Sequence, residues 1–473
     1  MWLVPIAMCL VAGWFLARAL TAGAFGSARW LGALTELSLA ALFGPGLASI
    51  LYVPLLRAGA ATQTGVLAML AALLAGSALI WWRITPKALP GPSGAKKLPW
   101  AWALGVFAAV GLIFLILDFQ AAAAANPNGE WDAMAIWNLR ARFLASSGEL
   151  WRRAISSEIG GGMAGAAHPG YPLFLSGFIA LQWIGGGTID QASPIVTSLL
   201  FSLGVFLLLG CGIAARKSLA LGALACLVLA ASEVFASQTS AQYSDLLQGF
   251  AFLATLVLLE AATGGDSPRL LIAAGLAAGL SAWIKNEGLP FAVAALAIGA
   301  WKFRSRSVWI AAGAAPGLLA TAFLKLFLAQ GHEAVFPQTL GEAVAKIAGP
   351  GRWWQAGLGF GKAIYDAGAG ITHPVLLAAL LGIVLRFIPA KERRARAWLW
   401  IPLAVTAAAE YSLYLVTEAN LDWHISTSVS RLVAQLWPAL IWLFLWMLRT
   451  PEELVETVPQ PAAKPRVAKR ARA

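Results

Sequence analysis

Long apolar runs constrain the fold of this sequence more than any other feature. A helix needs roughly 20 residues to cross the hydrocarbon core of a bilayer, and run after run of this chain approaches that length. Hydrophobic residues make up 59% of the 473 residues and charged residues 12%, about half the charged share of roughly 25% in soluble domains. Because lipid offers no hydrogen-bond partners to the backbone, spanning segments must be helices or closed barrels. The runs predict an all-α polytopic membrane protein.

We predict about 13 transmembrane helices, four before and nine after a large first outer loop at 118–192, which carries interfacial helices. The predicted spans are 2–16, 34–56, 66–82, 100–117, 194–213, 219–235, 246–259, 270–284, 289–301, 308–328, 375–388, 398–416 and 432–448. The segment 171–185 is apolar but short. If it spans, every later basic loop changes sides; if it is interfacial or re-entrant, the basic loops fall on one side, as the positive-inside rule requires.

The net charge of +12, from 34 Lys and Arg against 22 Asp and Glu, is chiefly a topology signal. With 171–185 not spanning, most basic residues lie in loops on one side, which places the N-terminus outside and the C-terminus in the cytoplasm. No basic residue precedes the first span, which argues against a signal peptide. We expect a multi-pass protein of the bacterial inner membrane. The basic tail from Lys464 is expected to be disordered and close to anionic lipid, which explains its charge better than nucleic acid does.

Five regions follow from this topology. They are N-terminal transmembrane helices (1–98), a transmembrane module that includes the outer loop 118–192 (99–328), an outer loop (329–372), C-terminal transmembrane helices (373–449) and the basic tail (450–473). The three cysteines all lie in apolar runs without metal-ligand spacing, so we expect neither a disulfide nor a zinc site.

Reactive side chains gather on the predicted outer face. All four histidines, His168, His332, His373 and His424, fall in outer segments. Charges within the spans are scarce, Glu410 and Lys325 being the nearest candidates, and we find no internal repeat. Both features argue against a secondary transporter, which typically has repeated halves and charged groups near the bilayer midplane.

The first outer loop holds the most informative string. A turn at 126–129 precedes Glu130, Trp131 and Asp132, and good helix formers follow. Trp131 and Trp137 suit a membrane interface, and Arg140 and Arg142 can reach lipid phosphates. We therefore predict an interfacial helix with Asp132 in its first turn. The alternative for Asp132 is simple interaction with the helix N-terminus.

Two other outer turns carry charged residues. Tyr243 and Asp245 precede a long span, where Asp245 is alternatively a helix cap. Lys285, Asn286 and Glu287 join predicted spans of 15 and 13 residues, which reach about 22 Å and 20 Å. Since the hydrocarbon core is roughly 30 Å thick, Lys285 is expected near the depth of lipid phosphates. Its alternative role is that of an anchoring lysine on a short hairpin.

A last outer loop, 421–431, concentrates hydrogen-bonding groups before the final span. It includes Trp423, His424 and Arg431. Hydroxyl and phosphate oxygens require such donors, and Trp stacks on sugar faces. A solvated loop is the alternative.

The ordered set of these features resembles the C-type glycosyltransferase (GT-C) superfamily, in particular bacterial members similar to protein mannosyltransferases and aminoarabinose transferases. The likeness covers about 100–301: an acidic residue opening an interfacial helix (Asp132), a proline-rich start of the next apolar segment (168–172), a second acid (Asp245) and a Lys turn (285–288). Many members carry adjacent Asp-Glu in the first loop, whereas Ala133 follows Asp132 here.

The resemblance implies transfer of a sugar from a polyprenyl-phosphate donor to a lipid, glycan or protein acceptor on the outer face. Polyprenyl phosphate is a competent leaving group, so the reaction needs a base for the acceptor and cations for the phosphate. We assign Asp132 as general base and Asp245 as a second catalytic acid that orients the acceptor or acts as nucleophile. Lys285 and Arg431 are assigned to the donor phosphate. Substrate-binding candidates are Glu130, His168, Tyr171, Tyr243, Asn286, Glu287 and His424.

No metal ligand is assigned, and the residues require no cofactor. The need for a divalent metal stays open, because Ala133 stands where many members of the superfamily have a Glu after the Asp. The sugar, the acceptor, the stereochemical course and the oligomeric state also stay open. A lipid-linked polymer ligase would share the outer face and the lipid phosphate, and a flippase is the rival from another class. A substitution of Asp132 discriminates between them, because a flippase should tolerate it.

Overall fold

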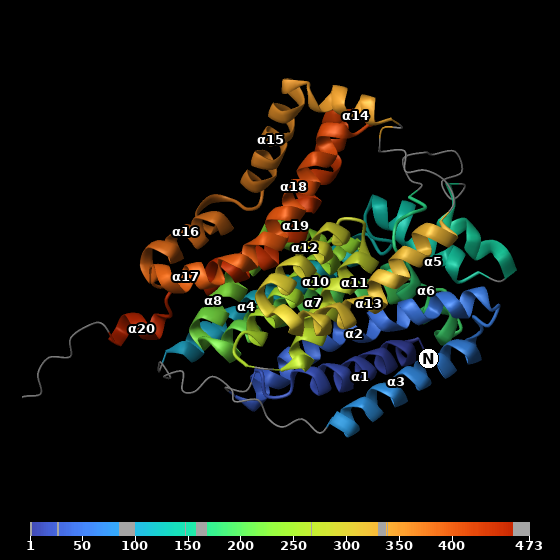
Figure 1. Ribbon diagram of the computed structural model, residues 1–473, viewed down its shortest axis with the longest axis horizontal. Helices are drawn as coiled ribbons and strands as arrows, with labels where there is room; N and C mark the ends of the chain where they lie inside the picture. Colours follow the sequence, from blue (N-terminus) through green and yellow to red (C-terminus); the bar gives the residue numbers. More distant parts are fainter. Residues whose placement is uncertain are drawn as a thin grey trace, which may run out of the picture.

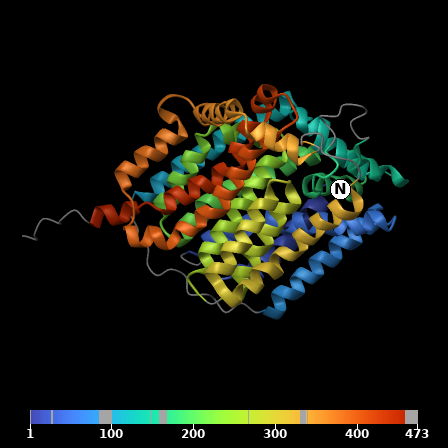
Figure 2. The same ribbon diagram turned by 45° about the horizontal axis from the view of Figure 1, so that its top comes forward.

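The structure, a computed structural model, describes residues 2–25, 28–84, 100–146, 148–157, 168–265, 267–329, 337 and 339–456. These residues form helices and no β-strand, with one isolated β-bridge between Phe387 and Leu448. The basic tail from Lys464 and His332 lie outside the described residues. Figures 1 and 2 show a bundle whose long helices run side by side, with the N-terminus and α20 at opposite ends.

The helices follow one another closely along the chain. The long ones are α1 (Leu3–Thr21), α2 (Arg29–Arg57), α3 (Gln63–Ile84), α4 (Ala101–Ala125), α7 (Ala192–Arg216), α10 (Ser244–Ala262), α11 (Pro268–Ile284), α12 (Gly288–Phe303), α13 (Val308–Phe323), α15 (Pro350–Tyr365), α18 (Ile401–Val416) and α19 (Leu421–Trp446). The shorter ones are α5 (Asn138–Leu144), α6 (Phe174–Gly186), α8 (Leu219–Ala230), α9 (Glu233–Ser240), α14 (Leu340–Ile347), α16 (Pro374–Leu385), α17 (Ala390–Arg396) and α20 (Pro451–Glu456). Two π-helices, η1 (Ala133–Trp137) and η6 (Leu324–Leu328), interrupt this pattern.

Nine helical segments of the described residues are long and apolar enough to cross a membrane, or ten if the bent pair α8 and α9 is one span. The protein is therefore an all-α, multi-pass membrane protein, but thirteen separate spans are not supported. The predicted spans 270–284 and 375–388 correspond to α11 and α16, which have 17 and 12 residues. At 1.5 Å per residue they reach about 26 Å and 18 Å, less than the roughly 30 Å core.

Two predicted spans, 289–301 and 308–328, lie in one apolar stretch of 41 residues, Gly288–Leu328. This stretch turns back on itself at Arg304, whose φ is 54°. Lys325 Nζ near its end donates a hydrogen bond to Asn286 Oδ1 just before its start, at 2.7 Å. The two ends are adjacent, so α12 and α13 form a helical hairpin.

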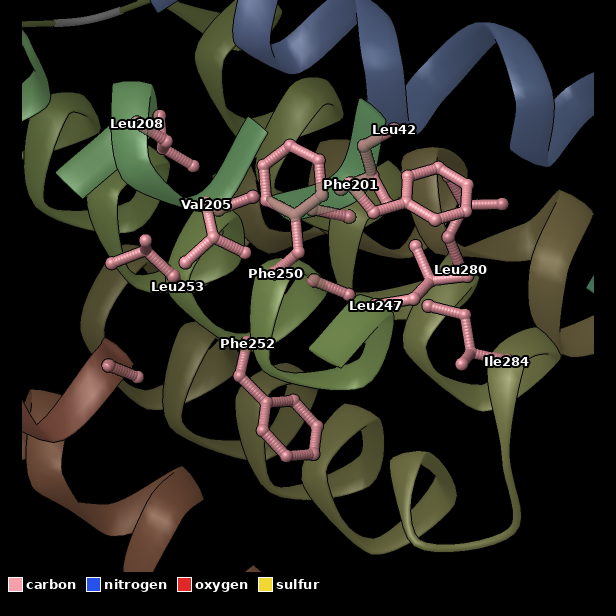
Figure 3. Close-up of a cluster of buried hydrophobic side chains, with 14 of the residues drawn as sticks. Leu42, Phe201, Val205, Leu208, Leu247, Phe250, Phe252, Leu253, Leu280 and Ile284 are labelled. Carbon is pink, nitrogen blue, oxygen red and sulfur yellow. The ribbon is translucent and has the colours of Figure 1, made fainter. Parts of the chain in front are cut away.

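Helix α10 occupies the centre, and every one of its residues is buried. Figure 3 shows Phe250, Leu247 and Leu253 of α10 packed among side chains of α2, α7 and α11. Close approach of other helices depends on glycine. A Cβ at Gly275 of α11 would lie 2.0 Å from Ile310 O, and one at Gly313 of α13 would lie 2.1 Å from Ile272 O. Small residues four apart permit such close packing in membranes, where no hydrophobic effect drives helices together.

The segment 171–185 contains α6, and both ends of α6 lie at the same end of the bundle. Ser176 Oγ near its start donates to Trp137 O at 2.9 Å. Near its end, Gln63 Nε2 at the start of α3 donates to Gly185 O at 3.3 Å. Its 13 residues form a buried helix that does not cross the bundle from end to end.

We name the two ends of the bundle by one residue each. The Asp245 end is where α10 begins, and the Lys217 end is where α7 finishes. At the Lys217 end, Arg216 Nη1 donates to Ala24 O, and Lys217 Nζ donates to Trp446 O at 2.7 Å. The described ends of α1, α7 and α19 thus meet there.

Helices occupy parts of two of the predicted outer loops. Within 329–372, α15 is a helix packed along α18 and α19: Tyr411 Oη donates to Trp353 O at 2.6 Å, and a Cβ at Gly359 would lie 2.5 Å from Ile425. The predicted loop 421–431 is the first part of α19. Helix α4 also continues to Ala125, beyond the predicted end of its span. Helix α15 and the first part of α19 escaped the sequence analysis because they lack a continuous apolar run.

Candidate functional site

Side chains from five parts of the chain meet at the Asp245 end. Asp132 comes from the segment after α4, Asp245 from the start of α10, and Lys285 from the turn between α11 and α12. Glu410 lies in α18, and Arg431 and Gln435 lie in α19. Asp132 and Arg431 are 299 positions apart in the sequence, yet their side chains form an ion pair. The residues assigned to the reaction are therefore brought together in one cluster.

The outer part of the cluster is the Asp132–Arg431 ion pair, in which Arg431 Nη1 donates to Asp132 Oδ2. Both side chains are 17% exposed, so the pair borders the surface. The guanidinium carbon of Arg431 lies 5.1 Å from the ring centroid of Tyr243. The backbone N–H of Asp132 donates to Tyr243 Oη at 3.2 Å. Burial raises the pKa of Tyr243 to about 12, so this phenol stays neutral.

The segment that carries Asp132 is docked against the turn before α10. Glu130 N donates to Ala241 O at 3.1 Å, and Asn138 Nδ2 donates to Gln242 Oε1 at 2.8 Å. Gly129 has a φ of 77°, and a Cβ there would lie 2.8 Å from Ala241 O. Only glycine fits such a left-handed, closely packed position without strain. This docking fixes Asp132 relative to Asp245.

The inner part of the cluster is centred on Lys285. Its Nζ lies 2.9 Å from Asp245 Oδ1 and 3.0 Å from Glu287 Oε1. Gln435 Nε2 also donates to Asp245 Oδ1 at 2.7 Å. Burial alone would lower the pKa of Lys285, but the two carboxylates outweigh burial and raise this pKa well above its ordinary value. The ammonium is therefore held in its charged form by two carboxylates.

Glu410 and Gln435 are residues of this cluster to which the sequence analysis gave no role. Glu410 is the charged one of the two. It is 2% exposed, and it is close enough to Lys285, Asp245 and Glu287 to interact with them electrostatically. Neither of its oxygens has a hydrogen-bond partner. The available signal was a single carboxylate inside an otherwise apolar span, which is a functional indication in membrane proteins.

Unpaired polar atoms concentrate around this inner cluster. The buried atoms without a hydrogen-bond partner include Ser244 Oγ, Asp245 Oδ2, both amide atoms of Gln248, Glu287 Oε2, both oxygens of Glu410, Arg431 Nε and Gln435 Oε1. In native proteins, well over nine tenths of buried polar groups are hydrogen-bonded, because an unpaired one costs about 1–3 kcal/mol. A group of them in one place indicates a site that binds a polar molecule.

The other predicted substrate-binding residues surround the cluster at different distances. Tyr171 stacks between His168 and Trp137, with ring centroids 4.4 Å and 5.6 Å away. Asn286 accepts a hydrogen bond from Lys325, and Glu130 is exposed. His424 lies about two helical turns before Arg431 on α19, and its Nδ1 is 3.0 Å from Thr417 Oγ1.

Two interfacial roles are wrong. Trp137 is 1% exposed and packs inside the bundle. Arg140 is 1% exposed, and its guanidinium donates to Ala154 O and Tyr171 O, both at 2.8 Å. It clamps the loop that follows α5 and does not reach lipid phosphates. Arg142 and Trp131, by contrast, are exposed, as an interfacial helix requires.

No group of three or more His, Cys, Asp or Glu side chains among the described residues has an arrangement that could hold a metal ion. Comparison of the chain with protein-family models, with curated proteins and with solved structures finds no match. The functional argument therefore depends on the residues themselves.

Proposed function

We propose that this protein is a membrane glycosyltransferase of the GT-C type, which moves a sugar from a polyprenyl-phosphate donor to an acceptor at the Asp245 end. The observation that carries the proposal is the convergence of Asp132, Arg431, Asp245 and Lys285 in one cluster. This cluster combines carboxylates that accept a proton with cations that stabilise a phosphate. In this proposal the Asp245 end faces the periplasm of a bacterial inner membrane.

An apolar groove beside the cluster supports a lipid-linked donor. It has a volume of about 610 Å³ and lies between α12 and α18, lined by residues such as Pro290, Val293 and Val405. The groove begins two residues after Glu287, so a hydrocarbon chain in the groove would have its head group beside Lys285. Apolar grooves with polar groups at one end are the usual form of such sites.

The proposed reaction uses the residues in defined roles. Asp132 accepts the proton of the acceptor hydroxyl or amine, the acceptor atom bonds to the anomeric carbon, and the bond from this carbon to the phosphate oxygen breaks. The electron pair leaves with the polyprenyl phosphate, whose charge Lys285 and Arg431 stabilise. Arg431 Nε has no partner, so the guanidinium can bind phosphate. A donor phosphate that binds Arg431 in place of Asp132 would also free the Asp132 carboxylate to accept a proton.

The unpaired atoms of Gln248, Glu410 and Gln435 suit a sugar, because hydroxyl groups both donate and accept hydrogen bonds. In this proposal Asp245 orients the reacting groups while it holds Lys285. Tyr243, neutral because burial raises its pKa to about 12, positions the backbone of Asp132.

Mass spectrometry of lipid-linked sugars in cells that lack the protein tests this function. We expect a polyprenyl-phosphate sugar to accumulate, and the wild-type protein to remove it. Asp132→Asn should lower transfer by 10²-fold or more, the usual contribution of a general base, while Asp118→Asn, a change at an exposed position of α4, should act as wild type.

Each rival function predicts another outcome of this experiment. If correctly inserted Asp132→Asn still removes the accumulated lipid-linked sugar, Asp132 is not the base and a flippase is favoured. Glu410 and Lys285 would then be the polar residues of its transport path. Accumulation of an unfinished polymer on its lipid, in place of a single lipid-linked sugar, would favour the ligase.

A further inference from the structure

A second polar hollow lies outside the cluster and includes residues of the segment that follows Asp132. It has a volume of about 110 Å³ and is lined by Asn128, Asn138, Arg142, Trp183, Asp190 and Gln191, together with apolar side chains. These residues come from the loop before η1, from α5, from the end of α6 and from the start of α7. The reaction proposed above uses none of them.

Two acceptor atoms of residues that line this hollow have no hydrogen-bond partner. Asn138 is 7% exposed, and its Nδ2 already donates to Gln242 Oε1 and Asn128 O, but its Oδ1 accepts nothing. Asp190 Oδ1 accepts from Ser193 N at 2.7 Å, and Asp190 Oδ2 is buried without a partner. A ligand that satisfies these oxygens must donate hydrogen bonds.

The charges of the hollow are balanced. The Arg142 guanidinium lies 5.6 Å from the ring centroid of Trp183, and Trp183 Nε1 donates to Asp190 O at 2.9 Å. One cation and one carboxylate therefore share the hollow, which favours a neutral ligand. A phosphate offers only acceptors and would face two unpaired acceptors, whereas a hydroxyl group both donates and accepts.

The hollow is coupled to the cluster through one side chain. Asn138 binds Gln242, whose neighbour Tyr243 contacts both Asp132 and Arg431. Asn138 is thus linked through Gln242 and Tyr243 to the Asp132–Arg431 ion pair.

We infer that this hollow binds a carbohydrate and, given the proposed function, that it holds the sugar of the acceptor. Among lipid, glycan and protein, the acceptor is then one that presents a hydroxyl-rich sugar ring. The donor sugar uses the separate set of polar atoms around Gln248 and Glu410.

Saturation-transfer NMR with methyl glycosides tests the inference on the full-length protein in lipid nanodiscs. We expect at least one methyl glycoside of a neutral hexose panel to bind wild type, and Asp190→Asn to weaken this binding roughly tenfold or more, since a charged acceptor is lost. Asn still caps α7 through its side-chain oxygen, so folding is preserved. Asp366→Asn, an exposed position outside the hollow, is the matched control.

The inference is overturned if no glycoside binds, if Asp190→Asn binds as well as wild type, or if Asp366→Asn weakens binding equally. Binding of inorganic phosphate that Arg142→Gln abolishes would identify an anion site and also overturn it. The failure of this inference can be told apart from the failure of the proposed function. If Asp190→Asn loses glycoside binding but Asp132→Asn leaves transfer unaffected, the carbohydrate site is retained and the mechanism is rejected. When both hold, Asp190→Asn raises the KM for the acceptor and leaves the KM for the donor unchanged.

Discussion

The two ends of the bundle both bury charged side chains, but they treat them differently. At the Lys217 end, Arg216 Nε donates to Glu260 Oε2 at 2.9 Å, and Ser218 Oγ is 2.9 Å and 2.8 Å from the two oxygens of Glu452. These carboxylates have polar neighbours that satisfy them. At the Asp245 end, Glu410 has no hydrogen-bond partner and Asp245 and Glu287 each keep one unpaired oxygen.

This difference distinguishes polar groups that stabilise the fold from polar groups that form a binding or catalytic site. Paired groups at the Lys217 end close the bundle by joining α7, α10 and α20, whereas unpaired groups at the Asp245 end raise the free energy of the folded protein. A cost of that kind is characteristic of binding and catalytic sites. The comparison predicts that substitutions at one end change stability alone, and that some at the other end change activity without loss of stability.

The largest expected effect on stability is that of Lys285→Met. The substitution leaves Asp245 and Glu287 as uncompensated buried carboxylates, so we expect the free energy of unfolding to fall by about 3–5 kcal/mol. Denaturant unfolding in lipid nanodiscs measures it. The double variant with Asp245→Asn should lose less than the sum of the single variants; strict additivity would show that the pair is not coupled.

Arg216→Met at the opposite end should have a smaller effect. Arg216 also donates to Ala24 O, and its side chain is 15% exposed, which weakens the ion pair. We expect a loss of about 2 kcal/mol in the free energy of unfolding. Transfer activity per folded molecule should stay at the wild-type value, and a specific loss of activity would contradict the separation of the two ends.

Glu410→Gln should behave in the opposite way. The change removes a charge from a buried position without hydrogen bonds, so the free energy of unfolding should not fall and can rise by about 1 kcal/mol. Transfer should fall by roughly tenfold or more as a sugar contact is lost. Glu260→Gln is the matched control, with reduced stability and normal activity. Equal behaviour of the two variants would remove Glu410 from the site.

The smallest effect is a pH dependence from Lys217. Burial lowers the pKa of Lys217 to about 8, although Glu453 acts in the other direction. Between about pH 8 and the unfolded value near 10.4, the unfolded chain binds more protons than the folded chain, so stability rises with pH. Lys217→Met should remove this rise in thermal unfolding curves. Lys285 contributes no such rise because its pKa is raised.

Apolar runs predicted the helices that pack within the bundle, since hydropathy reports burial in lipid or protein. Helix α15 shows the limit of that signal. Its sequence contains Arg352, Gln355 and Lys362 among small and aromatic residues, so no apolar run marks it. Its position depends on contacts such as the hydrogen bond from Arg352 to Tyr414 O, which no local pattern contains.

The residues of the candidate site also fall into those that the sequence indicated and those that it missed. Asp132 stood out because it opens a predicted interfacial helix, and Asp245 and Lys285 because each is a charged residue beside a predicted span. The structure places the three in one cluster. Glu410 received no role because the charged side chains near it come from α10 and from the turn before α12, which are distant in sequence. The burial of Arg140 was also missed, because an alternating Arg pattern on an amphipathic helix does not indicate which Arg turns inward.

The sequence alone determined that the chain is helical and crosses a membrane repeatedly, because the solvent preference of each segment is a local property. It also determined which residue types were available for chemistry. Tertiary structure decided which charges are paired and which buried oxygens stay unsatisfied. Those depend on distances of a few ångströms between residues as far apart as Asp132 and Arg431, and only the packing of helices sets such distances.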